Sequence, residues 1–153
     1  MRLNDPVVEI RRTRTVAAEP QAIWEVLADF GAISAWADNV DHSCLVSPEA
    51  RDVGVDTARR VQVGRNTLIE RVTEFIPPST LTYDVEGFPR WLRVNNRWTL
   101  TPSAGATTVA LVSSINITGP LGRIVERLVA RVSTKMLDEL LAGLATQLEG
   151  RRV

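Results

Sequence analysis

The sequence contains very few of the residues on which metal sites and disulfides depend. Among its 153 residues there is one cysteine, Cys44, and one histidine, His42. A single cysteine excludes an internal disulfide and favours a reducing compartment, so we expect a cytoplasmic protein. A zinc site needs three or four ligands, and no second histidine or cysteine is present. We therefore predict no metal and no other cofactor.

An excess of charge of one sign is also missing. Eighteen basic and eighteen acidic residues give a formal net charge of zero, which argues against a nucleic-acid partner. No window is apolar over the length of a membrane-spanning helix, and the N-terminus has no apolar run of signal-peptide length. We predict no nucleic-acid partner and no integral membrane segment.

Motifs of nucleophilic and phosphate chemistry are absent as well. The sequence has no G-x-S-x-G elbow. Residues 119–122 precede a predicted helix but lack the lysine and the glycines of a phosphate-binding loop. His42 and Cys44 would share a strand face, yet nothing in the sequence supplies the group that would activate the thiol.

The longest feature is an amphipathic pattern over residues 120–151, which predicts one helix about 45 Å long. Its apolar stripe comprises Leu121, Ile124, Val125, Leu128, Val132, Met136, Leu140, Leu141, Leu144 and Leu148. We expect this stripe to pack on the core of the protein. Docking of the helix on a membrane or a partner is the disfavoured alternative, because its polar face mixes arginine with acidic residues.

Alternating stretches supply the surface that such a helix needs. They predict strands at residues 7–16, 41–47, 57–63, 67–75, 80–86, 91–101 and 107–118. A short helix at 20–30, with Ile23, Leu27 and Phe30 on its buried side, and a second helical turn at 32–36 follow the first strand. Short turns between strands indicate an antiparallel meander. No repeat or linker divides the chain, so we expect one domain over 1–153.

Three segments resemble a known family. They are residues 16–30 (VAAEPQAIWEVLADF), residues 68–74 (LIERVTE) with the prolines and the L-x-Y that follow, and residues 97–109, which begin RWTLTP. These are similar to the START-like (SRPBCC) superfamily and, more narrowly, to its polyketide cyclase/dehydrase-like family. The resemblance implies the α+β helix-grip fold, in which a curved antiparallel sheet of about seven strands wraps around the long C-terminal helix and leaves a mostly apolar cavity. Val40 follows Asn39 where many relatives have proline, so the loop at the cavity mouth is expected to differ.

Two charged residues are candidates for the cavity. With a three-residue turn between the strands at 57–63 and 67–75, Arg60 falls opposite Glu70. If the pair faces the cavity, it can bind a polar head group or move a proton. If it faces the convex, solvated side, it is a weak cross-strand ion pair, and Val61, Val63 and Ile69 face the cavity instead.

The tryptophans divide by position. Trp36 and Trp91 lie near loop ends and are predicted at the rim of the cavity, whereas Trp98 is predicted to pack under the long helix. Each of the polar residues on otherwise apolar strand faces either orients a ligand or satisfies a buried neighbour. The candidate ligand-binding residues are Trp36, Arg60, Glu70, Tyr83, Trp91, Asn96, Trp98 and Ser113.

Three functions remain open. The first is binding or carriage of a hydrophobic or aromatic small molecule, lipid- or polyketide-like, in the central cavity, entered between the helix pair and the loop 87–90. The resemblance also implies an aromatase/cyclase, in which Arg60, Glu70, Tyr83 or Asn96 would polarise carbonyls or shuttle protons. The third is a protein-interaction module built on the same fold. Neither catalytic residues nor an oligomeric state is assigned.

Overall fold

The computed structural model describes residues 7–47, 52–120 and 122–150. Its elements follow the predicted order: β1 (Val7–Val16), α1 (Pro20–Ala28), the 3-10 helix η1 (Phe30–Ala35), β2 (His42–Leu45), β3 (Ala58–Val63), β4 (Asn66–Ile76), β5 (Thr80–Glu86), β6 (Leu92–Ser103), β7 (Ala106–Ile117) and α2 (Gly122–Glu149). No helix in these ranges is both long enough and apolar enough to cross a membrane.

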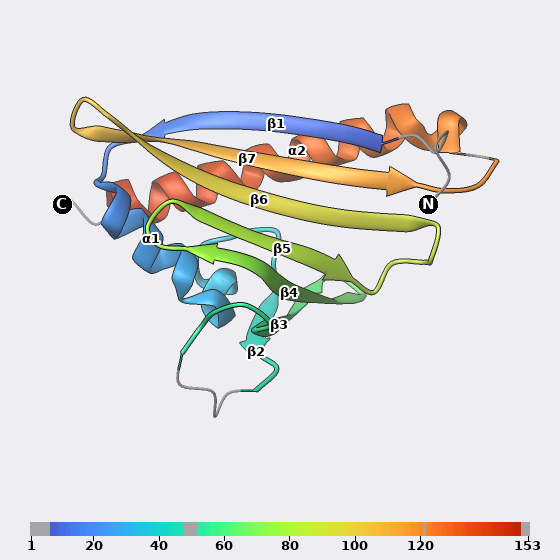
Figure 1. Ribbon diagram of the computed structural model, residues 1–153, viewed down its shortest axis with the longest axis horizontal. Coiled ribbons are helices and arrows are strands. Elements are labelled where there is room, and N and C mark those ends of the chain that lie inside the picture. Colours follow the sequence, from blue (N-terminus) through green and yellow to red (C-terminus); the bar gives the residue numbers. More distant parts are fainter. Residues whose placement is uncertain (1–6, 48–51, 121, 151–153) are drawn as a thin grey trace.

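The seven strands form one antiparallel sheet in the order β1-β7-β6-β5-β4-β3-β2. Strands β2 to β7 make the expected meander, and β1 adds to β7 at the far edge, with Val8 opposite Ile115. The sheet curves, and α2 runs along β1 and β7 while α1 lies near the C-terminal end of α2 (Figure 1). This is the helix-grip fold, as the sequence predicted.

The turn between β3 and β4 is one residue shorter than predicted. Val63 lies opposite Asn66, so only Gly64 and Arg65 form the turn. Gly64 takes a φ of 59°, a conformation that glycine adopts without steric cost and that two-residue hairpin turns need. Successive side chains of a strand point to opposite faces of the sheet. A shift of one residue in the pairing therefore changes which residues of β3 share a face with a given residue of β4. The register therefore differs from the predicted one along the entire hairpin.

The core lies on the concave face of the sheet. The largest completely buried side chains are Trp98, Tyr83, Phe30, Ile23, Leu81, Leu111, Ile115, Ile117 and Leu144. They come from α1, η1, β5, β6, β7 and α2, so one cluster joins the helices to the sheet. Each such side chain contributes about 1.5–3 kcal/mol by leaving water. Burial of this face is what holds α2 against the sheet.

Only the C-terminal half of α2 buries its apolar residues as predicted. The buried side chains are Leu137, Leu140, Leu141, Leu144, Ala145 and Leu148. Four members of the predicted stripe are instead exposed: Ile124 (74%), Leu128 (63%), Val132 (51%) and Met136 (37%). Leu121 lies outside the described residues. Steps of four residues advance about 40° more than one turn of a helix, so such a row winds around the axis rather than staying on one face.

A glycine lets α2 approach the end of η1 closely. Gly143 lies against the carbonyl oxygen of Trp36, and a Cβ at this position would clash with that oxygen. Backbone atoms cannot move aside as a flexible side chain can. The contact therefore fixes where the C-terminal half of α2 crosses the segment after η1.

Candidate functional site

A row of polar side chains crosses the concave face of the sheet. Tyr83 of β5 lies directly opposite Asn96 of β6, and Asn96 lies directly opposite Ser113 of β7. All three side chains are buried among apolar neighbours. We call these three residues the polar row. The period-2 alternation of each strand indicated its polar residue, but only the pairing of the strands brings the three together.

A buried ion pair lies beside the polar row. Arg59 Nε contacts Glu70 Oε1 at 2.7 Å, and Arg59 Nη1 donates a hydrogen bond to the carbonyl oxygen of Phe30 at 2.9 Å. The guanidinium carbon lies 3.8 Å from the centre of the Phe30 ring and 4.8 Å from that of Tyr83. Its charge is thus met by a carboxylate, a carbonyl and two aromatic faces. This pair joins the edge of the sheet to η1.

The predicted partner of Glu70 was wrong by one residue. With the shorter turn, Arg59 lies opposite Glu70, and Arg60 lies opposite Ile69. Arg60 is exposed on the opposite face of β3. Glu70 faces inward, together with Val61 and without Arg60. The alternation of β3 already placed Arg59 and Arg60 on different faces, and the length of the turn decides which of them is buried.

Tyr83 sits in surroundings that keep its phenol protonated. Its hydroxyl oxygen accepts a hydrogen bond from Trp98 Nε1 at 3.2 Å. Burial raises the pKa of Tyr83 above its ordinary value, and the negative charge of Glu70 raises it further. Arg59 and hydrogen bonding from Trp98 and Asn96 offset part of this rise. Tyr83 can therefore act as a hydrogen-bond donor or a weak acid, but not as an ionised base.

Two buried polar atoms near Tyr83 have no partner among the described residues. They are Oδ1 of Asn96, an acceptor, and Nε1 of Trp36, a donor. The rings of Trp36 and Trp98 meet edge to face with centres 5.9 Å apart. Because Trp98 hydrogen-bonds to Tyr83, this contact places Trp36 near the polar row. An unpaired buried polar group costs about 1–3 kcal/mol. A bound molecule with a hydroxyl and a carbonyl would supply both missing partners.

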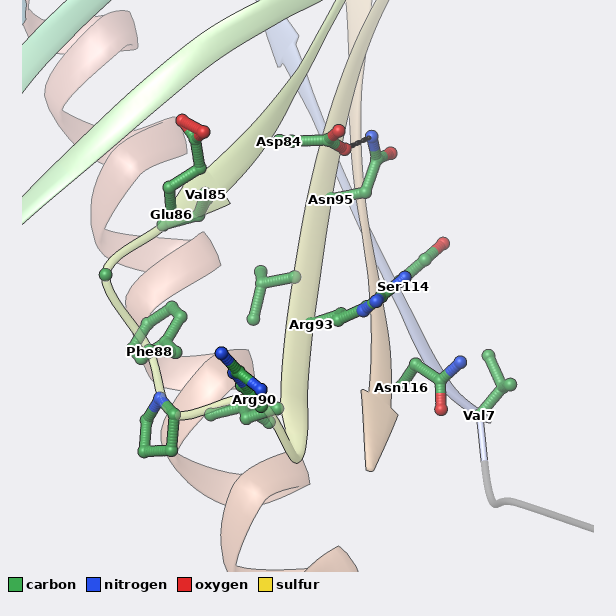
Figure 2. A pocket seen from close by; sticks show the side chains of 14 residues that line it. Val7, Asp84, Val85, Glu86, Phe88, Arg90, Arg93, Asn95, Ser114 and Asn116 are labelled. Atoms are coloured by element: carbon green, nitrogen blue, oxygen red, sulfur yellow. Dashed lines mark hydrogen bonds between the residues drawn. The ribbon is translucent and has the colours of Figure 1, made fainter. Parts of the chain in front are cut away.

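A pocket of about 940 Å³ opens at the end of the sheet where β5 turns into β6. Figure 2 shows Phe88 and Arg90 on one side of the β6 ribbon, and Arg93, Asn95 and Asn116 on the other. The residues that line it are Val7, Asp84, Val85, Glu86, Gly87, Phe88, Pro89, Arg90, Leu92, Arg93, Val94, Asn95, Ser114 and Asn116. The pocket thus combines an apolar loop with polar strand ends.

The pocket opens mainly on the face of the sheet opposite to the polar row, because Asp84, Asn95 and Ser114 line it and each is next in sequence to a member of the row. Val85 and Val94 line the pocket and lie opposite one another. Each is two residues from a member of the row, Tyr83 and Asn96 respectively, a distance of about 7 Å along a strand. The loop 87–90, predicted to form the entrance to the cavity together with the helix pair, forms one wall of this pocket, and the described residues that line it include none from α1 or η1.

The structure separates the other predicted site residues. Trp36 is buried in the core rather than at a rim, and Trp98, predicted to pack under the long helix, is buried against Trp36. Trp91 is 46% exposed, and its carbonyl oxygen accepts a hydrogen bond from the backbone N–H of Thr118 just before α2. Trp91 therefore lies outside the cluster formed by the polar row and the ion pair.

The sequence interpretation missed Arg59 and Phe30 as parts of the site. Phe30 was expected in the core, but its carbonyl and ring also hold the guanidinium. The glycine at 64, followed by an arginine and an asparagine, was compatible with a turn of two or three residues, and only the shorter one brings Arg59 to Glu70.

Comparison with known proteins gives a family and a fold. A protein-family model described as "Polyketide cyclase / dehydrase and lipid transport" matches residues 7–149. A search of curated proteins finds no match.

Three solved structures illustrate the likeness in fold. A protein from Thermus thermophilus is 21% identical, with 95% of this chain and all of that chain covered and a TM-score of 0.76. A START superfamily protein from Mycobacterium smegmatis is 15% identical, with coverages of 93% and 97% and a TM-score of 0.74. The Zhui aromatase/cyclase from Streptomyces sp. R1128 is 18% identical, with coverages of 93% and 96% and a TM-score of 0.69.

Proposed function

Because this chain belongs to the polyketide cyclase/dehydrase and lipid transport family, we propose that it binds a hydrophobic or aromatic small molecule, lipid- or polyketide-like, at the polar row. The observation that carries the proposal is the pair of unpartnered buried atoms, Asn96 Oδ1 and Trp36 Nε1. Both lie in apolar surroundings, where a ligand gains most from a hydrogen bond. Action in the cytoplasm, expected from the single Cys44, is part of the proposal.

The chemistry of these atoms specifies the polar part of the ligand. A hydroxyl of the ligand donates to Asn96 Oδ1, and a carbonyl oxygen accepts from Trp36 Nε1 or from the protonated Tyr83 hydroxyl. The remaining surface of the ligand packs on Val85, Val94 and the neighbouring apolar side chains.

Carriage accounts for this site better than catalysis. The carboxylate of Glu70 is held by Arg59 at 2.7 Å, and Tyr83 is held in its protonated form. A general base has to take a proton from the substrate, and neither a carboxylate that is paired with Arg59 nor a phenol that stays protonated is well placed to do so. The cluster is therefore suited to orienting a ligand through neutral hydrogen bonds.

An aromatase/cyclase-type enzyme is the second candidate, favoured by one observation. The raised pKa of Tyr83 leaves a neutral phenol next to the polar row, and such a donor polarises a carbonyl as an enolate develops. In that case Tyr83→Phe should abolish turnover of the bound compound and leave its affinity within about threefold, since only the transition state would lose a hydrogen bond. Equal loss of binding and turnover would contradict this role.

The test of the proposal is native mass spectrometry of the protein purified gently from its own host, followed by solvent extraction. We expect a stoichiometric small molecule in the wild type, and its loss in Asn96→Leu. The matched control is Asn95→Leu, because Asn95 is half-buried on the other face of the sheet, where it hydrogen-bonds to Asp84. Urea unfolding should show that Asn96→Leu is folded, because leucine has a similar size, Oδ1 of Asn96 has no partner to lose, and the lost hydrogen bond to Tyr83 costs only about 1 kcal/mol. Retention of the molecule by folded Asn96→Leu would contradict the proposal.

A further inference from the structure

The N-terminal half of α2 exposes two parallel rows of side chains. The apolar row consists of Ile124, Leu128, Val132 and Met136, and the basic row consists of Arg123, Arg127, Arg131 and Lys135. All eight residues are exposed. Both rows repeat every four residues, and each basic residue immediately precedes an apolar one. The two rows therefore stay side by side over about 18 Å of helix.

The basic row lies on the side of α2 next to the free edge of β1. Arg131, Lys135 and Asp138 line one shallow surface pocket of about 630 Å³, and Asp138 pairs with Arg12 of β1 at 2.7 Å. The apolar row lies further round the helix, away from this edge. Side chains on the core-facing side, such as Val129, are half-buried. Both rows therefore point away from the body of the protein.

The basic row has few carboxylates near it, and two of them, Asp138 and Glu139, lie at its C-terminal end in the same pocket as Arg131 and Lys135. Among the described residues, none of the four basic side chains has a carboxylate oxygen within 4.0 Å, and the observed ion pairs all involve other arginines. Between Gly122 and Met136 the one acidic residue is Glu126, which is half-buried. A chain with zero net charge thus carries a locally basic surface beside a row of exposed aliphatic side chains.

An exposed tryptophan extends the surface at the start of α2. Trp91 is 46% exposed and is held by its hydrogen bond from Thr118, four residues before the helix begins. Figure 1 shows the loop between β5 and β6 at the same end of the molecule as the start of α2. That loop also carries Phe88 (37% exposed) and Arg90. Tryptophan and arginine beside aliphatic residues are the side chains favoured at a membrane interface.

We propose that this half of α2 docks on an anionic phospholipid surface, lying in the plane of the interface. The apolar row enters the boundary between head groups and acyl chains, and the basic row contacts lipid phosphates on one side of it. A two-fold dimer that pairs the two helices antiparallel through this face would bring the two basic rows together, which like charge disfavours. The apolar row lies on a convex helix surface, and the pocket beside it is shallow, so this face fits a deformable bilayer better than a folded protein.

The test is co-flotation of the full chain with vesicles at low salt. We expect binding to vesicles of phosphatidylcholine mixed with phosphatidylglycerol, and little binding to phosphatidylcholine alone. Arg127→Gln with Arg131→Gln should weaken binding about thirtyfold, from the attraction of two basic residues to an anionic surface. Leu128→Ser with Val132→Ser should weaken it at least about tenfold through lost apolar burial.

Matched controls place the same chemical changes elsewhere on the surface. Arg60→Gln removes an exposed arginine from β3, and Ile76→Ser removes an aliphatic side chain that is 49% exposed at the end of β4. Both should bind vesicles as the wild type does. Circular dichroism of every variant shows whether α2 is intact.

Three results would overturn the proposal. One is absence of binding to the anionic vesicles, and another is wild-type binding by both double variants. The third is a wild type that is dimeric in solution, becomes monomeric on Leu128→Ser with Val132→Ser, and does not bind vesicles. That result would make the face an interface between copies of the chain. The vesicle assay does not depend on the polar row, so its failure would leave the proposed ligand site to be tested separately.

Discussion

Replacing Arg59 by methionine removes the cation of the buried ion pair and keeps a long apolar side chain in its place. In the folded protein the Glu70 carboxylate then stays buried without the guanidinium that meets it at 2.7 Å. Breaking a buried pair in this way costs about 3–5 kcal/mol. The contacts of the guanidinium with the Phe30 and Tyr83 rings, at 3.8 and 4.8 Å, are lost as well, and the methionine side chain replaces part of them. We therefore expect the free energy of unfolding to fall by about 3–5 kcal/mol, a large share of the 5–15 kcal/mol of an ordinary domain.

Urea unfolding followed by tryptophan fluorescence measures this loss, because urea does not screen the ion pair as a salt would. Arg60→Met is the matched control. Arg60 is the next residue on β3 but is exposed on the other face, so its replacement should change stability by less than about 0.5 kcal/mol. A double variant, Arg59→Met with Glu70→Leu, should recover much of the loss, since both charges are then absent.

Two outcomes would refute the reasoning. If Arg59→Met lowers the free energy of unfolding by less than about 1 kcal/mol, the Glu70 carboxylate is not left buried and unpaired in that variant. If Arg60→Met loses as much as Arg59→Met, the register of the hairpin is the one that a three-residue turn would produce. If Arg59→Met is too unstable to fold, the free energy of unfolding of the double variant can still be compared with that of the wild type.

The remaining predictions concern pH, packing and binding. Tyr83 is the one tyrosine in the sequence, and its pKa is raised in the folded protein. The free energy of unfolding should therefore stay constant below about pH 10 and fall above it, because the unfolded chain ionises first. Tyrosinate absorbance and unfolding measured across that range should show this fall, and Tyr83→Phe should remove it. Gly143→Ala should lower the free energy of unfolding by more than about 1 kcal/mol despite the higher helix propensity of alanine, because the added Cβ meets the Trp36 carbonyl. Gly150→Ala is the control, since a Cβ there has no described atom within 4 Å, and it should have little effect in the same urea assay. Glu70→Gln should leave the affinity for a co-purified ligand within about tenfold, and a larger loss in a binding titration, more than roughly 1.4 kcal/mol, would contradict carriage of an apolar ligand.

The inward face of the central strands was predictable from the sequence. Leu81 and Val85 flank Tyr83 at steps of two, Val94 and Trp98 flank Asn96, and β7 shows the same alternation. A strand that packs on a core has to place every second side chain inward, so the pattern gives both the element and its buried face. The order of strands and helices followed from the same patterns and from the turn residues between them. The family resemblance then implied how the sheet closes around α2.

The pairing of charges depended on the tertiary structure. The alternation of β3 shows that Arg59 and Arg60 face opposite ways, but it does not show which of them faces the core. That depends on a turn of two residues rather than three, because a shift of one residue exchanges the faces. Trp36 and Trp91 illustrate the same limit. Both lie near loop ends in the sequence, yet one is buried against Trp98 and the other is exposed beside the start of α2.

The sequence by itself determined that residues after Pro120 form one long helix with an apolar stripe. It did not determine how much of that stripe has a surface to cover it. The sheet and η1 bury apolar side chains completely only in the C-terminal half, so Leu140 and Leu144 are buried while Leu128 and Val132 face outward. Local periodicity reports which side chains share a helix face, whereas burial depends on what other segments of the chain bring to that face. Only the tertiary structure contains that second piece of information.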